Sequence, residues 1–289
     1  MRRLRLLVLA FFAVVFIIFS FTRLREYIVS DYTSPVIQAD TDSIEVSVNA
    51  GDEELLAGMT ATDNLDGDVT NTLVVVSKTK FISKGKLRVN YAAFDKNNNV
   101  GVAARNVTYT DYYSPRFSMS QPLRFVSGNS STNYLKYVTA TDCLDGNITQ
   151  QIKITFGDTE STSNSSSRQK VNIQVTNSAG DTATLELWAV FEDYNSYSVP
   201  APALSNYIIY VNQGERPDYS SYVKGVWTAG STKGFGDVSG YSASDVSVSD
   251  SGVNYNVPGV YTATYQLSRQ DDTGRTPLGT ATMIVVVEG

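Results

Sequence analysis

The sequence predicts an all-β protein in which three tandem β-sandwich domains follow a single N-terminal transmembrane helix. Three observations support this prediction: an unbroken apolar run near the N-terminus, a composition that favours strands, and segments that recur along the chain. The chain has 289 residues, which suits more than one domain. Tyr, Ser, Thr, Asn and Val are abundant, and no Leu-rich helical stretch follows the N-terminal run.

The apolar run covers residues 6–21 and contains a single Ser. As a helix it measures about 24 Å, somewhat less than the roughly 30 Å of a hydrocarbon core. Arg5 on one side and Arg23 and Arg25 on the other can extend to the lipid headgroups and cover the difference. The run therefore predicts a membrane-spanning helix, with residues 6–22 in contact with the membrane.

This helix is interpreted as a retained signal anchor rather than a cleaved signal peptide. The run is longer than most signal-peptide cores, and the best cleavage candidate, Ser20-Phe21-Thr22, does not match the small-x-small pattern. Arginines precede the run at positions 2, 3 and 5, which places the N-terminus in the cytoplasm. We therefore expect a single-pass plasma-membrane protein, with a cytoplasmic tip and anchor at 1–30 and an extracellular C-terminus.

Repeats divide the remainder of the chain into three domains. The stretch DYTSP begins at Asp31, its near-copy DYYSP begins at Asp111, and the related DYNSYSVP begins at Asp193. Each stretch combines Asp-Tyr, a Ser and a Pro, and proline both breaks a preceding strand and stiffens the connection. The predicted domains are 31–112, 113–195 and 196–289.

Each domain is predicted to be a β-sandwich. Apolar and polar residues alternate in SIEVSVNA and in KLRVNYAAF, where Leu87, Val89 and Tyr91 share one face. Every domain also closes with two alternating strands around a turn, which is typical of a β-hairpin. Short strands separated by turn clusters favour two packed sheets. A polar insert at 157–170 of the second domain predicts a long mobile loop.

A decapeptide occurs twice, as ATDNLDGDVT at 61–70 and as ATDCLDGNIT at 140–149. With the closing hairpins YAAFDKNNNVGVAARNVTY and VTNSAGDTATLEL, it resembles the bacterial immunoglobulin-like repeats of pesticidal crystal proteins and many cell-surface proteins. Domain 2 departs from the family pattern at Asn177, where the family usually has Asp, and domain 3 fits more loosely. The resemblance implies tandem seven-stranded immunoglobulin-like sandwiches, a surface location and no enzymatic activity.

Two roles for the decapeptide follow from its residues. As a fold element it ends a strand and forms a loop, in which Asp63 and Asp66 bond to backbone N–H groups and Gly67 supplies a positive φ. As a metal site it supplies carboxylates of the kind that calcium prefers, because this loop and the hairpin turn lie at one pole of such a sandwich. The structural role is favoured, since it explains the recurrence without a common ligand. The calcium candidates are Asp63, Asp66, Asp68 and Asp95 in domain 1, and Asp142, Asp145 and Asp181 in domain 2 with Asp111 from the junction.

Residue types that are missing limit the chemistry. With no His, the chain cannot build a Ser-His-Asp or Cys-His catalytic centre or a His-ligated metal site. A single cysteine, Cys143, allows no internal disulfide. A carboxylate-pair hydrolase needs two carboxyl groups that face a substrate groove, which nothing in the sequence indicates. We therefore expect a protein that is not an enzyme and needs no cofactor.

The expected function is a membrane-anchored extracellular stalk or interaction protein of the bacterial cell envelope. The alternative is a binding module in which domain 3 recognises glycan or protein, because half of the 18 tyrosines lie in 197–289 and exposed aromatic rings stack on sugars. Those tyrosines also fit as strand and core residues, which is the simpler interpretation. Expected partners are the membrane and an envelope glycan or surface protein. Nucleic acid is not expected, because no basic run follows Arg25 and the formal charge is −6.

Overall fold

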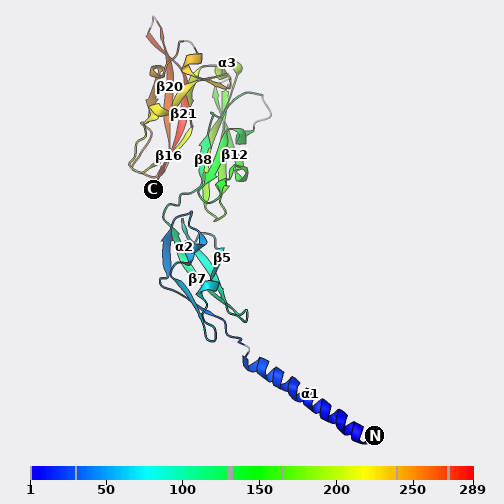
Figure 1. Ribbon diagram of the computed structural model, residues 1–289. Helices are drawn as coiled ribbons and strands as arrows, with labels where there is room; N and C mark the ends of the chain where they lie inside the picture. Colours follow the sequence, from blue (N-terminus) through cyan, green and yellow to red (C-terminus); the bar gives the residue numbers. More distant parts are fainter. Residues whose placement is uncertain (1, 30, 129–132, 164–165, 239, 272–273) are drawn as a thin grey trace. The chain divides into compact units, whose positions relative to one another are not determined.

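The structure, a computed structural model, describes the chain except residues 1, 30, 129–132, 164–165, 239 and 272–273. It consists of a long N-terminal helix, α1 (Arg2–Val29), followed by β-sheets with a few short helical turns (Figure 1). The sheets form three pairs, each with one sheet of three strands and one of four. Three tandem seven-stranded sandwiches behind an apolar helix are the fold class that the sequence predicts, and this prediction is confirmed.

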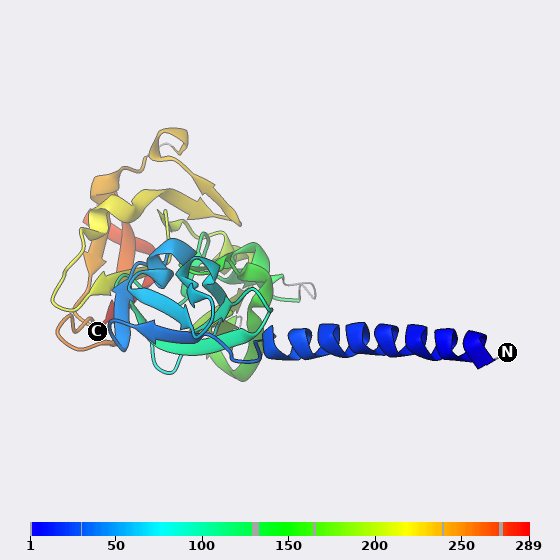
Figure 2. The same ribbon diagram turned by 60° about the horizontal axis from the view of Figure 1, so that its bottom comes forward.

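Helix α1 is continuous, as Figure 2 shows. Its residues include no Gly or Pro, so nothing interrupts the backbone hydrogen bonding. The segment Leu4–Arg25 has a mean hydropathy of 2.7, and none of it is buried by the rest of the protein. The helix thus exposes Leu, Phe, Ile and Val side chains around its whole circumference.

Domain 1 (31–112) has a buried face on each of its sheets. The smaller sheet has the order β1-β3-β4 and the larger β2-β7-β6-β5, with β2 parallel to β7. Leu87, Val89 and Tyr91 are buried on one face of the β6 strand, as the alternation predicts. The elements are β1 (Val36–Ala39), β2 (Ser43–Val46), α2 (Asp52–Leu56), β3 (Met59–Asp63), β4 (Gly67–Asp68), η1 (Thr70–Thr72), β5 (Val74–Lys78), β6 (Lys86–Phe94) and β7 (Val100–Tyr109).

A buried arginine holds α2 against the larger sheet of domain 1. Arg105, on the inner face of β7, is only 2% exposed. Its guanidinium donates hydrogen bonds to the carbonyl oxygens of Leu55 (2.6 Å) and Ala57 (2.9 Å) at the end of α2. The Tyr91 hydroxyl donates to the same Leu55 carbonyl (2.9 Å), and the guanidinium lies over the Tyr91 ring. These bonds satisfy carbonyls that the short helix leaves without backbone donors.

Domain 2 (113–195) repeats this arrangement. Its sheets have the orders β11-β10-β8 and β12-β13-β14-β9. The polar insert is not a loop in the described residues, because β12 and β13 pair through it, with Glu160 opposite Arg168. Thr favours extended backbone, and Arg168 both binds Glu160 and stacks over Trp188, so the predicted mobile loop was wrong. The elements are β8 (Arg116–Met119), β9 (Arg124–Val126), η2 (Tyr134–Lys136), β10 (Val138–Asp142), β11 (Gly146–Asn147), η3 (Thr149–Gln151), β12 (Lys153–Ser163), β13 (Ser166–Thr176), β14 (Thr182–Glu192) and α3 (Tyr194–Tyr197).

Domain 3 (196–289) has sheets of the orders β15-β17-β18 and β16-β21-β20-β19. Tyr210, Tyr261 and Tyr265 lie in strands, whereas Tyr207 lies in the bend before β16. Tyr207 and Tyr265 are buried and Tyr210 and Tyr261 are half-buried, so the interpretation as strand and core residues is confirmed except that Tyr207 is outside the strands. The elements are β15 (Ala201–Leu204), β16 (Ile208–Asn212), η4 (Tyr219–Tyr222), β17 (Val223–Thr228), β18 (Ser231–Lys233), η5 (Phe235–Asp237), η6 (Ala243–Asp245), β19 (Val246–Ser249), β20 (Gly259–Asp271) and β21 (Gly274–Glu288).

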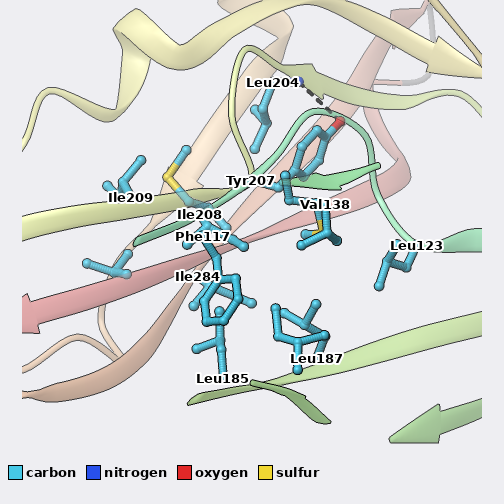
Figure 3. Packing of buried hydrophobic residues seen from close by; sticks show 14 of the residues in the cluster. Phe117, Leu123, Val138, Leu185, Leu187, Leu204, Tyr207, Ile208, Ile209 and Ile284 are labelled. Atoms are coloured by element: carbon cyan, nitrogen blue, oxygen red, sulfur yellow. Dashed lines mark hydrogen bonds between the residues drawn. The ribbon is translucent and has the colours of Figure 1, made fainter. Parts of the chain in front are cut away.

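Domains 2 and 3 share one hydrophobic core. The chain separates into two compact units, 1–112 and 113–289, and the second unit contains both domains. Figure 3 shows Phe117 and Leu187 of domain 2 in the same cluster as Tyr207 and Ile284 of domain 3. Side chains of this kind are close-packed, so the two domains stabilise one another.

Polar contacts fix the seam between domains 2 and 3. The Tyr207 N–H donates to the Met119 carbonyl (2.8 Å), and the Phe117 N–H donates to the Tyr210 hydroxyl oxygen (2.8 Å). Arg116 pairs with Glu288 and lies over the Tyr210 ring. Directional bonds of this kind set one relative placement of the two sandwiches within this unit.

Candidate metal centre

The two decapeptides form the same loop. Asp63 Oδ1 accepts hydrogen bonds from the N–H groups of Leu65 and Asp66, both at 2.9 Å. Asp142 Oδ1 likewise accepts from Leu144 (2.9 Å) and Asp145 (3.1 Å). Gly67 has φ +74° and Gly146 has φ +68°, a region that favours glycine. The predicted role of the decapeptide as a recurring turn is confirmed, and the Asp66 and Leu65 N–H groups hold the pKa of Asp63 below its usual value.

The next carboxylate in each loop binds the turn of the closing hairpin. Asp66 accepts hydrogen bonds from the Lys96 N–H and from Lys96 Nζ, both at 2.8 Å. The Lys96 ammonium is the main reason that the pKa of Asp66 is lowered. In domain 2, Asp145 accepts from the Ser178 N–H and Oγ, both at 2.6 Å. Asp66 therefore joins two loops, rather than capping its own loop as predicted.

The structure places three further predicted candidates apart from any common centre. Asp68 Oδ1 accepts a hydrogen bond from the Thr70 N–H (2.9 Å). Asp111 accepts from Ser47 Oγ (2.7 Å) and the Val48 N–H (2.8 Å), so it serves domain 1 instead of completing a group in domain 2. Asp181 Oδ1 accepts from the neighbouring Thr182 N–H (2.9 Å).

Asp63 and Asp95 come together with a residue that sequence reasoning missed, Asp31. One carboxylate oxygen of each of the three lies within 4.8 Å of the others. Asp31 and Asp63 are 8% exposed and Asp95 is 7% exposed. Three different segments supply these residues: the stretch before β1, the last residue of β3 and the β6–β7 turn. Asp31 begins the DYTSP stretch, and its match to Asp111 in the second junction was the available signal.

The oxygens of this carboxylate cluster, Asp31–Asp63–Asp95, are only partly satisfied. Asp31 Oδ1 accepts from the Thr33 N–H (2.8 Å), while Asp31 Oδ2 and Asp63 Oδ2 are buried with no hydrogen-bond partner. Asp95 accepts from Asn99 at both oxygens, at 2.7 Å from the backbone and 2.6 Å from the side chain. Among the ion pairs of the described residues, none includes these three aspartates. Like charges this close and this buried need a proton or a cation to offset them.

In domain 2 a hydrogen bond, rather than a cation, satisfies the corresponding carboxylate oxygen. Asn177 occupies the place of Asp95, and its side-chain N–H donates to Asp142 Oδ2 (3.1 Å). This oxygen corresponds to Asp63 Oδ2, which has no donor in domain 1. An amide group thus takes the position where domain 1 has a third carboxylate, and Asp111, which matches Asp31 in sequence, bonds to Ser47 and Val48 instead, so the pole of domain 2 lacks two of the three carboxylates.

Comparisons with known proteins show distant structural similarity only. No protein-family model and no curated protein matches the chain. A solved structure of CBM51-2 in complex with GlcNAc and INT domains from Clostridium perfringens ZmpB matches at 15% identity and TM-score 0.22, over 54% of this chain and 41% of that one. The chain therefore spans less than half of that relative.

Two cadherin structures match over more of the chain. Protocadherin gammaB7 EC3-6, solved as a cis-dimer, is 14% identical over 89% of this chain and 74% of its own, with TM-score 0.21. Human CDH23 EC21-23 is 13% identical over 88% of this chain and 100% of its own, with TM-score 0.22. Neither the sugar nor the dimer of those proteins is inferred for this chain.

Proposed function

We propose that this chain is a membrane-anchored surface protein of the bacterial envelope, in which α1 spans the membrane and the sandwiches act outside as a non-enzymatic interaction module. The observation that carries the proposal is the complete exposure of α1. Its apolar segment Leu4–Arg25 is covered by nothing else in the described chain. At 22 residues this segment measures about 33 Å, enough for a hydrocarbon core of roughly 30 Å. In water so much apolar surface would be strongly unfavourable, whereas a bilayer solvates it.

The proposed orientation places the N-terminus in the cytoplasm. Arginines at positions 2, 3 and 5 lie on one side of the apolar segment, and positive charge stays on the cytoplasmic side. The sandwiches would then lie outside, where the compact unit 113–289, with its shared core, would offer a large surface to a partner. A fixed surface lowers the entropy lost on binding, which suits an interaction module.

The proposal assigns no catalysis to the sandwiches. The chain has no His and a single Cys, and most of the carboxylates at the loop poles are already bonded to backbone N–H groups.

The alternative, in which domain 3 stacks a glycan on tyrosines, loses its main support. In 197–289, every tyrosine is at least half-buried.

Membrane fractionation tests the anchor. We expect the full chain to sediment with membranes, to resist extraction by alkaline carbonate and to be released by detergent. A variant that lacks residues 1–25 and carries a heterologous secretion signal should be soluble, because only α1 presents a membrane-spanning surface in the described chain. A mature protein that begins near Arg23, recovered in the soluble fraction, would show instead that α1 is a cleaved signal peptide.

A further inference from the structure

The carboxylate cluster of domain 1 has a charge that the described protein does not offset. Asp31 and Asp63 are more than nine-tenths buried, and each keeps one oxygen without a hydrogen-bond partner. Asp95 adds a third carboxylate within the same 4.8 Å. A turn alone does not need this third carboxylate, because Asp63 already receives its two backbone bonds through Oδ1. We propose that Asp31, Asp63 and Asp95 bind one calcium ion.

The separations suit a single ion. Calcium binds oxygen at about 2.3–2.6 Å, so two oxygens on opposite sides of one ion lie about 4.6–5.2 Å apart. Three oxygens within 4.8 Å of one another lie at most about 2.8 Å from a common point, so a shift of a few tenths of an ångström brings all three to calcium distance. The backbone bonds to Oδ1 of Asp31 and Asp63 fix both side chains while leaving each Oδ2 available. Such anchoring reduces the entropy lost when the ion binds.

The ligand chemistry selects calcium among common divalent ions. The cluster offers carboxylate oxygens only, without the imidazole or thiolate groups that zinc prefers. Magnesium needs a nearly ideal octahedron at about 2.0–2.1 Å and gives up its water reluctantly. Three segments that meet at one pole form a more adaptable site, which suits the larger ion.

The second repeat supplies an internal comparison. In domain 2 the Asn177 side chain donates to Asp142 Oδ2, the position where domain 1 keeps an unpaired oxygen. The amide hydrogen places partial positive charge next to this carboxylate oxygen, as the calcium ion would in domain 1. We therefore expect calcium dependence in domain 1, and Asp95→Asn should weaken it by placing there the amide that domain 2 has at Asn177.

The ion would join the start of the sandwich to its loops. Asp31 lies two residues after the end of α1 at Val29, whereas Asp63 is the last residue of β3 and Asp95 lies in the β6–β7 turn. Calcium would thus fix the chain that leaves α1 to one pole of domain 1. This consequence for an anchored protein rests on the proposed function, whereas calcium binding itself does not. A negative result in membrane fractionation would therefore contradict the anchor alone, and a negative result in calcium binding would contradict the metal site alone.

Calorimetry of the full chain in detergent micelles tests the proposal with calcium alone. We expect one calcium per chain. At about a hundredfold excess over the dissociation constant, the midpoint of thermal unfolding of domain 1, followed by hydrogen–deuterium exchange of the β6–β7 peptides, should rise by about 10–20 °C relative to chelator. Asp95→Asn should lower calcium affinity at least tenfold. In chelator its stability should stay close to that of the wild type, because the loss of a repelling charge offsets the loss of the acceptor for Asn99 Nδ2.

Two further variants test a second ligand and provide a control for the substitution of an aspartate. Asp31→Asn removes a ligand from outside the sheets, so it should fold and lose at least tenfold in affinity. Asp68→Asn is the matched control, because domain 2 already has Asn147 there with the same bond to a threonine N–H. It should bind calcium like the wild type. No calcium binding by the wild type, full binding by Asp95→Asn, or equal stabilisation by magnesium would overturn the proposal.

Discussion

Replacing Tyr207 by alanine is expected to unfold domains 2 and 3 together at a lower temperature. Tyr207 is 1% exposed in their shared core, and its hydroxyl oxygen accepts a hydrogen bond from the Leu204 N–H (3.2 Å) (Figure 3). Removing a buried aromatic ring costs about 3–5 kcal/mol, through lost burial and the cavity left behind. For a unit of this size the midpoint should fall by about 6–20 °C.

The two tryptophans of the chain make this measurement possible. Trp188 lies in domain 2 and Trp227 in domain 3, so single-tryptophan backgrounds made with Trp227→Phe or Trp188→Phe report each domain separately. Each effect of Tyr207→Ala is compared with its own background. Both fluorescence midpoints should fall together. An unchanged Trp188 midpoint beside a lowered Trp227 midpoint would show that the shared core does not couple the domains.

Tyr207→Phe is the matched control, since it keeps the ring and removes the hydroxyl. Burial raises the pKa of Tyr207 to about 12. The folded state therefore favours the neutral phenol, and this stability is present below about pH 10 and is lost as pH rises towards 12. Tyr207→Phe should lose about 1–3 kcal/mol at pH 7, less than Tyr207→Ala, because only the acceptor of the buried Leu204 N–H is removed. Its stability should fall less steeply than that of the wild type between pH 10 and 12.

Arg105→Ala is expected to destabilise domain 1 by about 3 kcal/mol. The substitution leaves the Ala57 carbonyl without its donor, removes one of two donors from the Leu55 carbonyl, and opens a cavity behind β7. The nearby Asp40, at 3.7 Å from the guanidinium, is largely exposed and contributes little. Without this clamp, α2 should separate from the larger sheet.

Hydrogen–deuterium exchange in the full chain measures this effect, because it separates domain 1 from the remainder. Exchange in the β6–β7 peptides should accelerate in Arg105→Ala, while peptides of 113–289 stay unchanged. Arg88→Ala is the control, since Arg88 lies on the exposed face of the adjacent strand β6 and should change stability by less than about 0.5 kcal/mol. Equal exchange in the two variants would show that the buried arginine is not a structural clamp.

Local patterns were sufficient to predict much of the fold. The alternation of Leu87, Val89 and Tyr91 determines which face of β6 is buried, and period-two patterns are read directly from sequence. The turn at Asp63 was also predictable, because an aspartate two residues before its backbone donors needs no tertiary context. The apolar run of α1 depends on composition alone.

Features that depend on distant residues could not be predicted in this way. The shared core of domains 2 and 3 unites Phe117 with Ile284, and single-strand patterning does not say which sandwich a buried side chain faces. Predicting the carboxylate cluster would have required knowing that Asp31, in the junction before domain 1, lies against Asp63 and Asp95 of that domain. The polar strands at 157–170 were missed because their pairing depends on the Glu160–Arg168 contact, not on an apolar face.

Cysteine labelling in intact cells tests the central claim, that α1 anchors sandwiches which lie outside the membrane. In a Cys143→Ser background, Ser251→Cys places one thiol at an exposed position of domain 3. A second version carries its only cysteine in a short extension of the N-terminus. We predict that a membrane-impermeant maleimide labels Ser251→Cys in intact cells and labels the N-terminal cysteine only after lysis. In both variants the labelled protein should be found in the membrane fraction. Labelling of the N-terminal cysteine in intact cells, or of Ser251→Cys only after lysis, would contradict this account.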